Sequence, residues 1–562
     1  MAKNSKTKMH SYIPELAEKL RKGEVTRRDF IQTATLLGVS AGAAYTMAGM
    51  PGPGRKAHAA AKKGGNLRVS MNVKASDDPA TFDWSEKGNV ARHMTEPLVR
   101  VSEDGVARPY LAESWSASED LKTWTFNLRK NATWSNGDSF GADDVIHNFR
   151  RWLDPNTGSS NQGRFSSMTV TNDTGKKDDK GNAIMSTTEA GGALEKVDDH
   201  TVRFHLNNAD LALPESMADY PALMVHKNFD DEGGDLIKNP VGTGPYALQN
   251  FAVGEKATLV RRSDAAWWGG EVNLDQISYI DHGDDPAAQI AALASGQVDT
   301  NYQTSIEQVE TIKNIPDLQI YERVTAQTGV ARMHVTEAPY DNKKLRQAVQ
   351  ACVDHNKMLE IVYRGRGGIA EDHHVSPVHP EYAELPKQTQ DYAKAKALLA
   401  EAGYADGIDL RIDCVANPAW EQNVCKALSE MVKPAGINLA INIMPGGTYW
   451  DIWASTPFGF TAWTHRPLGV QVLNLAYRTG VAWNETNYSN AEFDSTLDKA
   501  GAILDPNERR VVTRKLEGIL QDDAIISQSF WRSVFVTANK RVQGLYAQVA
   551  LEHHYNDVWL DG

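Results

Sequence analysis

Cysteine is scarce in this sequence: the 562 residues contain three, Cys352, Cys414 and Cys425. None lies near the N-terminus, which excludes a lipid-modified cysteine there. Cys352 and Cys425 fall on the apolar stripes of expected helices, so we expect buried free thiols. A Cys414–Cys425 disulfide in an oxidising compartment is the alternative, and the spacing alone does not decide between them.

The sequence also lacks the motifs that hold cofactors and metals. No phosphate loop G-x-x-x-x-G-K-[ST], no H-E-x-x-H and no paired C-x-x-C occurs. A G-x-S-x-G at residues 38–42 lies in the N-terminal segment, and we interpret it as chance. The adjacent pairs His373-His374 and His553-His554 suit a metal poorly, because neighbours on a strand point to opposite faces. We expect a binding protein with no cofactor, no metal and no catalytic residue.

Positive charge is in deficit, with 59 Lys and Arg against 72 Asp and Glu and a net charge of −13. The first 61 residues are basic, with ten Lys and Arg and four Asp and Glu, so the rest carries −19. An acidic body of this kind argues against nucleic acid or an anionic membrane as the main partner. The length predicts roughly three to four domain-sized units.

Residues 1–61 have the organisation of an export signal. Residues 26–32, TRRDFIQ, resemble a twin-arginine signal, an uncharged run extends over 30–54, and small residues follow at Ala57, Ala59 and Ala61. We expect passage through the twin-arginine translocase, cleavage near Ala59–Ala61 and a periplasmic location. An amphipathic helix with a membrane anchor is the alternative, although glycines and hydroxyls make the run weakly apolar.

Residues 239–302 predict a compact α/β unit. After an opening rich in Gly and Pro, strand-like runs occupy 257–261 and 277–280. A helix with Pro286 at its first position ends before Gly296, and Val298 opens another short strand. This order is typical of one lobe of a layered domain.

The same stretch carries three motifs in an order known from one family. They are N-P-x-G-T-G-P-Y at 239–246, an aromatic-Trp-Gly turn at 267–269 and small-Gly-x-Val-Asp at 295–299. Further matches are PYLAESW at 109–115 and the helix LRQA…D at 345–354, with partial ones at 82–84 and 96–98. The chain therefore resembles the family 5 extracellular solute-binding proteins, the peptide- and nickel-type receptors of ABC importers.

The resemblance implies an α/β, two-lobed periplasmic-binding-protein fold (type II, cluster C-like) with an extra subdomain inserted in the first lobe. Crossings between the lobes are expected at 318–335 and 527–536. The ranges that we assign are 1–61 for the signal peptide, 62–107 and 240–326 for lobe I, 108–239 for its inserted subdomain, 327–530 for lobe II and 531–562 for the return to lobe I.

The resemblance also implies a monomer that captures a small organic solute, peptide-like solutes included, and delivers it to an inner-membrane permease with its ATPase subunits. Oligosaccharides, opine-like conjugates and metal chelates are alternative solutes. A twin-arginine-exported enzyme and a binder that serves no permease are the alternative functions.

Periodicity predicts the remaining elements. Trp124, Phe126 and Leu128 alternate with polar residues, as in a half-buried strand, and we place Trp115, Trp124 and Trp152 in the core. Residues 171–192 are polar without periodicity and predict an exposed loop. One further helix is expected to begin after Asp341, which we predict as its N-cap. Other expected helices cover 142–152, 391–403, 421–432, 493–504 and 506–519. Other expected strands cover 67–73, 202–206, 410–415 and 438–443.

Residues 449–483 are the richest candidate for the ligand cleft, because Trp450, Trp453, Trp463 and Trp483 lie there among Gly and Pro breaks. In peptide-binding relatives, the loop after the tryptophan that matches Trp463 supplies an aspartate for the ligand's α-ammonium. Here that loop begins Thr464-His465-Arg466, and no Asp or Glu occurs from 452 to 484. The usual ammonium site is therefore missing.

Arg466 has two interpretations that the sequence leaves open. Its guanidinium suits a ligand carboxylate or phosphate, and it equally suits pairing with a structural acid. Trp531 and Tyr302 are further candidates for the cleft. His93 and Arg332 are candidates too, although a salt bridge or a satisfied polar group of the core explains either of them as well.

Overall fold

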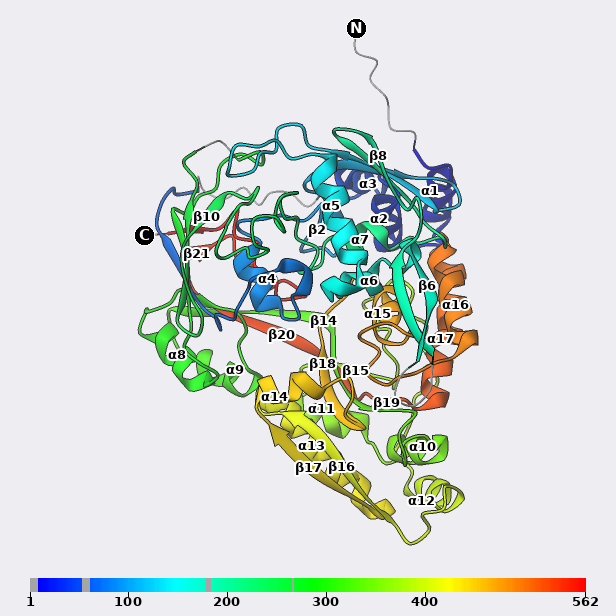
Figure 1. The fold of residues 1–562 in the computed structure, drawn as a ribbon. Coiled ribbons are helices and arrows are strands. Elements are labelled where there is room, and N and C mark those ends of the chain that lie inside the picture. Colours follow the sequence, from blue (N-terminus) through cyan, green and yellow to red (C-terminus); the bar gives the residue numbers. More distant parts are fainter. Residues whose placement is uncertain (1–8, 53–60, 178–182, 265–266, 562) are drawn as a thin grey trace.

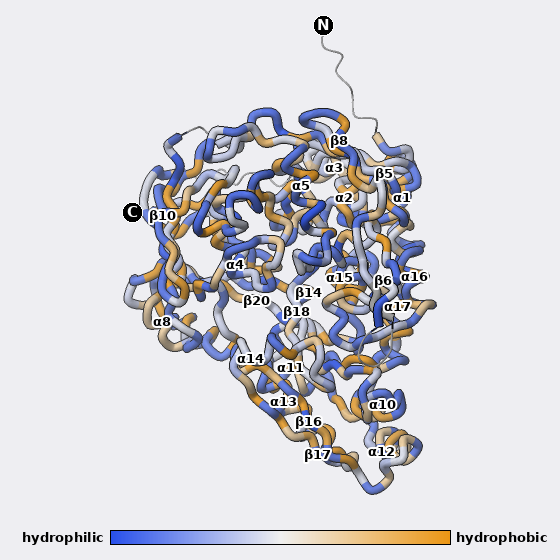
Figure 2. The backbone as a smooth tube through the Cα atoms, viewed as in Figure 1, coloured by the Kyte–Doolittle hydropathy of each residue, from blue (hydrophilic) through white to orange (hydrophobic). Residues whose placement is uncertain are grey.

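The computed structural model describes residues 9–52, 61–177, 183–264 and 267–561. Among them, no helix is both long and apolar enough to cross a membrane. Figure 2 shows hydrophobic segments alternating with hydrophilic ones along the chain, as expected where each element buries one face.

One sheet of twelve strands extends through both halves of the molecule. Its order is β10 (Tyr246–Ala252), β11 (Lys256–Arg261), β12 (Gln276–Ile280), β1 (Asn66–Ser70), β13 (Thr300–Asn301), β20 (Phe530–Asn539), β14 (Leu318–Met333), β18 (Phe458–Trp463), β16 (Ile408–Val415) and β17 (Ile437–Met444). In addition, β15 (Gly367–Ile369) pairs with β20, and β19 (Ile526–Ser527) pairs with β14.

Two long antiparallel strands, β14 and β20, connect the halves and lie in the middle of Figure 1. They pair from Leu318 with Asn539 to Thr328 with Trp531, and the register shifts between Val324 and Gln327. The crossing expected at 318–335 is thus one sixteen-residue strand, Leu318–Met333, with an irregularity between Val324 and Gln327. The two-lobed α/β fold is confirmed, with lobe I on the β10–β13 side and lobe II on the β18–β17 side.

Lobe I carries its subdomain on a second sheet, in the order β4 (Ala112–Ala117), β5 (Thr123–Leu128), β9 (Thr201–His205) and β8 (Leu194–Asp198). Trp115, Trp124 and Trp152 are buried in its core, as predicted. The other elements of lobe I are α4 (Ser85–Ala91), β2 (Val99–Val101), β3 (Ala107–Pro109), α5 (Ala142–Leu153), α6 (Asn161–Arg164), α7 (Leu213–Ser216), α8 (Pro286–Ala294), α9 (Val309–Ile312), β21 (Val542–Gln543) and β22 (Trp559–Leu560).

Helices accompany β16, β17 and β18 in the range assigned to lobe II. They are α10 (Lys343–Ala351), α11 (His355–Tyr363), α12 (Tyr392–Glu401), α13 (Ala419–Val432), α14 (Gly446–Ile452), α15 (Gly469–Ala476), α16 (Ala491–Ala502) and α17 (Pro506–Asp523). Of these, α13 packs against all three strands. The predicted cap Asp341 is wrong by one residue, because the Asn342 side chain accepts the Lys344 amide at 3.0 Å. Asp and Asn cap equally well, so residue type alone could not separate the two positions. The three cysteines are buried free thiols.

The loop predicted for 171–192 is instead a hairpin of β6 (Thr169–Lys177) and β7 (Ala183–Glu189). Residues 170–177 of β6 are exposed, so no apolar face marks the strand in the sequence. Cross-strand polar pairs hold it, such as the hydroxyls of Thr171 and Thr187 at 2.8 Å.

The N-terminal segment, which the sequence led us to leave out of the fold, is folded where it is described. It forms α1 (Tyr12–Lys22), α2 (Arg27–Leu36) and α3 (Ala41–Met47), grouped beside α16 and α17 and the subdomain in Figure 1. Phe30 of α2 is fully buried. The Trp115 indole donates to the Leu36 carbonyl at 2.8 Å, and Arg510 of α17 pairs with Asp29 at 2.8 Å. The segment thus contacts both lobes.

We expect Phe30→Ala to lower the free energy of unfolding of the full-length chain by about 3–5 kcal/mol, since it leaves a cavity among buried side chains. Denaturant unfolding measures this, with the exposed Met47→Ala as the control. Equal stability of the two variants would show that α2 does not pack on the body.

Candidate ligand cleft between the lobes

Three adjoining cavities lie along the junction of the lobes. Gln548 and Glu552 line both the first and the third, while Asp219, Arg466 and Gln471 line both the second and the third. Their volumes are small, about 10, 10 and 30 Å³, on the scale of one or a few water molecules. Because neighbours share walls, we treat the three as one cleft.

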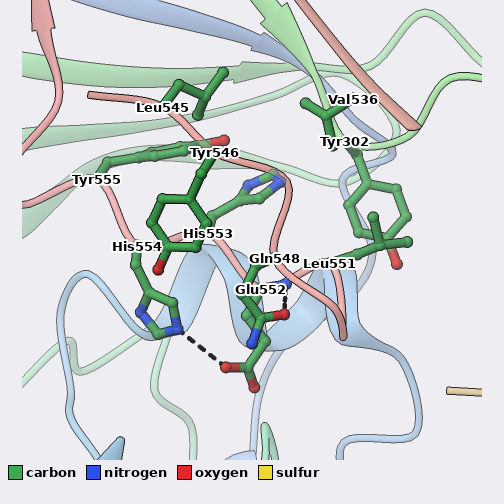
Figure 3. A pocket seen from close by; sticks show the side chains of 10 residues that line it. All are labelled: Tyr302, Val536, Leu545, Tyr546, Gln548, Leu551, Glu552, His553, His554 and Tyr555. Atoms are coloured by element: carbon green, nitrogen blue, oxygen red, sulfur yellow. Dashed lines mark hydrogen bonds and ion pairs between the residues drawn. The ribbon is translucent and has the colours of Figure 1, made fainter. Parts of the chain in front are cut away.

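The first cavity belongs to lobe I (Figure 3). Its walls include the rings of Tyr302 and Tyr546, with Gln548 and Glu552 between them. His554 lies 3.1 Å from Glu552, and Arg92 pairs with the same carboxylate at 2.9 Å. Burial alone would raise the pKa of Glu552, but Arg92 and His554 hold it below its ordinary value. This carboxylate is therefore compensated.

An ion cluster joins the lobes beside the second and third cavities. Asp219, which follows α7, accepts a hydrogen bond from the Arg164 Nε atom at 3.0 Å and lies 3.0 Å from the Arg466 Nε atom. Burial by itself would raise the pKa of Asp219, yet the two guanidiniums outweigh it and keep that pKa low. Because Arg466 comes from lobe II, the pair is a contact of the closed arrangement. Of the two interpretations of Arg466, the structure shows the second, in which Arg466 pairs with an acidic residue of the protein, Asp219.

Two more contacts cross the same junction. The Gln471 amide donates to the Ser216 hydroxyl at 3.3 Å. The Arg164 guanidinium lies 5.1 Å from the centre of the Trp483 ring, within the range of cation–π attraction. Lobe II thus meets lobe I through side chains on both flanks of Asp219.

The predicted tryptophans Trp450, Trp453, Trp483 and Trp463 form a row of neighbouring rings. Trp84 of lobe I, which was not predicted, contacts the Trp450 end of this row. Ring centres are 5.3 Å apart for Trp84 and Trp450, 6.0 Å for Trp450 and Trp453, 6.4 Å for Trp453 and Trp483 and 5.9 Å for Trp483 and Trp463. Trp463 and Trp531 are buried, whereas Trp450, Trp453 and Trp483 are partly exposed. None of these rings lines the three cavities described above.

Arg332 and His93 have partners inside the protein. Arg332 is fully buried, pairs with Glu485 at 3.0 Å and donates to the carbonyls of Thr456 and Trp453. Glu485 also accepts the Trp463 indole at 2.8 Å. The His93 Nε2 atom lies 2.9 Å from the Tyr279 hydroxyl. The salt-bridge and core explanations account for both residues, and their role as ligand contacts stays a prediction.

Three of the predicted residues line the cavities: Tyr302, His465 and Arg466. The His465 Nδ1 atom accepts the Ala326 amide at 3.0 Å, and burial keeps the pKa of this imidazole well below its ordinary value. Thr464 accepts a hydrogen bond from Arg466. The sequence missed Arg164, Glu215, Asp219, Gln471, Gln548 and Glu552, because nothing local marks residues that meet only in the fold.

Glu215 on α7 differs from the other acids of the cleft. Its side chain lines the third cavity, the residue is 2% exposed, and neither carboxylate oxygen has a hydrogen-bond partner among the described residues. Burial and the charge of Glu381 raise the pKa of Glu215 to about 8, against the opposing field of Arg509.

Two lobes joined by two crossing strands, with a cleft closed by contacts between the lobes, define the class of two-lobed solute-binding proteins. The family model described as "Bacterial extracellular solute-binding proteins, family 5 Middle" matches residues 107–470. The chain belongs to this family, as its sequence resemblance predicted, and the family comprises solute receptors rather than enzymes.

Three similar proteins illustrate the relationship. Heme-binding protein A of Haemophilus influenzae is 26% identical over 453 residues, which cover 74% of this chain and 77% of that protein. The ABC transporter-associated periplasmic binding protein DppA from Helicobacter pylori, in complex with peptide STSA, has a TM-score of 0.77 at 20% identity, and the match covers 89% of this chain and 99% of DppA. AgaA of A. tumefaciens, in complex with agropinic acid, has a TM-score of 0.75 at 21% identity, and the match covers 88% of this chain and 100% of AgaA.

We expect Asp219→Asn to favour separation of the lobes, because it leaves two buried guanidiniums facing each other. Removing one partner of a buried ion pair costs about 3–5 kcal/mol. Small-angle scattering should show a larger radius of gyration, and denaturant unfolding a lower stability. Glu271→Gln, which removes an exposed pair with Lys63, is the control and should change neither. Equal scattering of the two variants would mean that this carboxylate does not hold the lobes.

Glu215 predicts a pH dependence of stability. The folded chain retains the Glu215 proton up to about pH 8, whereas the unfolded chain loses it near pH 4.5, so stability falls as pH rises between these values. In Glu215→Gln, the decrease in the free energy of unfolding over this pH range should be smaller by on the order of 4 kcal/mol. Unfolding measured from pH 5 to 9 tests this, and identical slopes for wild type and variant would contradict it.

Proposed function

We propose that this protein is the receptor of an ABC importer, which captures a peptide-like or other small organic solute between its lobes and delivers it to a membrane permease. The observation that carries the proposal is the buried Asp219–Arg466 contact across the junction, with cavities on either side lined from both lobes. A solute held there touches both lobes at once.

The mechanism is a shift of population between open and closed forms. A solute that contacts lobe I and lobe II stabilises the closed form by its extra contacts there, and the β14 and β20 strands accommodate the motion. The permease recognises the closed shape, and its ATPase subunits drive uptake. Residues 1–61 direct the chain to the periplasm by the twin-arginine route. The boundaries of lobe I, its inserted subdomain and lobe II are proposed as assigned from the sequence. The receptor acts as a monomer.

The solute class does not transfer from the relatives, because one is named for heme, one holds a peptide and one holds agropinic acid. In this chain the loop after Trp463 carries no acid for an α-ammonium. The ligand contacts proposed from the sequence are Tyr302, Trp450, Trp453, Trp463, Thr464, His465, Arg466, Trp483 and Trp531, with His93 and Arg332 as further candidates. Oligosaccharides, opine-like conjugates and metal chelates remain alternatives to a peptide.

Native mass spectrometry of the protein purified from its own cells is the direct experiment, and we expect it to show a co-purifying organic solute. Adding that solute to stripped protein should reduce the radius of gyration in solution scattering, and chromatography should recover it unchanged. If that solute is anionic, Arg466→Ala should weaken its binding by about 1–3 kcal/mol, the scale of a charged hydrogen bond. An unchanged radius, or conversion of the solute into product, would contradict a receptor.

A further inference from the structure

The third cavity brings charged groups of both lobes together. Lobe I contributes Glu215, Asp219 and Glu552, and lobe II contributes His465 and Arg466. Most of these charges are already matched: Asp219 holds Arg164 and Arg466, and Glu552 holds Arg92. His465 is neutral because burial lowers its pKa.

Glu215 is the exception in this balance. It is as buried as its neighbours, yet both of its oxygens lack a hydrogen-bond partner among the described residues, and no ion pair within that part of the chain includes it. Arg509 acts on it only through its field, and the Arg509 Nη1 atom donates to the Ile503 carbonyl at 3.1 Å. A buried carboxylate without a donor costs several kcal/mol, and a partner that supplies positive N–H donors would relieve this cost.

We propose that the Glu215 carboxylate binds a cationic nitrogen of the solute, an ammonium or a guanidinium, in the third cavity. This deepens the proposed receptor function and rests on it. The site lies on lobe I, in α7, and not in the lobe II loop after Trp463 where the sequence resemblance placed an ammonium contact. The raised pKa of Glu215 is consistent with an acid that lacks its cation in the free protein.

The remaining walls favour an organic cation over an anion or a metal ion. Arg466, the arginine that lines this cavity, is paired with Asp219, so an anion would have to compete with a buried carboxylate for it. In the part of the chain that the structure describes, no cluster of three His, Cys, Asp or Glu could hold a metal. The Gln548 side chain also lines the cavity; its oxygen accepts the Ala550 and Glu552 amides, which leaves its amide N–H groups as neutral donors for the rest of an organic solute.

Two pairs of probes test the charge preference by calorimetry. Acetyl-arginine amide and acetyl-citrulline amide have the same shape and differ in the guanidinium, while glycyl-leucine and acetylglycyl-leucine differ in the α-ammonium. We expect at least one cationic member to bind wild type at least tenfold more tightly than its neutral partner. Glu215→Gln should bring this ratio near one, and the exposed Glu271→Gln should retain it.

Glu215→Asp is a second variant, which keeps the carboxylate but shortens the side chain by one methylene. It should lower the ratio of cationic to neutral probe affinity, but less than Glu215→Gln does. The proposal is overturned if neither cationic probe is preferred by wild type, or if Glu215→Gln keeps the preference. Closure of wild type around its co-purified solute, seen by scattering without any cation preference, would leave the receptor function intact and remove only this proposal. Absence of closure with that solute would remove the receptor function itself.

Discussion

One buried carboxylate joins the two lobes at the cleft. Asp219 lies between Arg164 of its own lobe and Arg466 of the other, where little water screens the charges. Three charged groups of this kind are tolerated in an interior only when each has its partner in place. The contact therefore exists only when the lobes meet, and it fixes where the cavities on either side of it can lie. The Glu215 site depends on the same closure.

The tryptophan row and the polar cavities are distinct parts of one junction. The Trp463 indole donates a hydrogen bond to Glu485, which is itself paired with the buried Arg332, so this ring has a fixed orientation. The row continues through Trp483 and Trp450 to Trp84 of the other lobe. The Arg164 side chain of the ion cluster lies over the Trp483 ring, so the tryptophan row and the charged groups are neighbours in the junction.

Elements with local signals could be predicted from the sequence, and the contacts of the cleft could not. The helices at Ala142 and Pro286 and the long crossing at 318–333 follow from periodicity, caps and turn residues. The β6–β7 hairpin was missed because polar residues on both faces hide a strand. Arg466 could be named as a candidate, but its partner Asp219 lies 247 positions earlier in the chain, and no spacing rule joins the two. Glu215 carries no local mark at all, since its lack of a partner is a property of the fold.

The N-terminal helices add a mechanical constraint. Leu36 is attached to the subdomain through Trp115, and Asp29 is attached to α17 through Arg510, so the two anchors are only seven positions apart. A chain segment this short cannot stretch far within a helix, so wide separation of α17 from the subdomain requires that one anchor break. The full-length chain is consequently a stiffer hinge than the same body with its first helices removed.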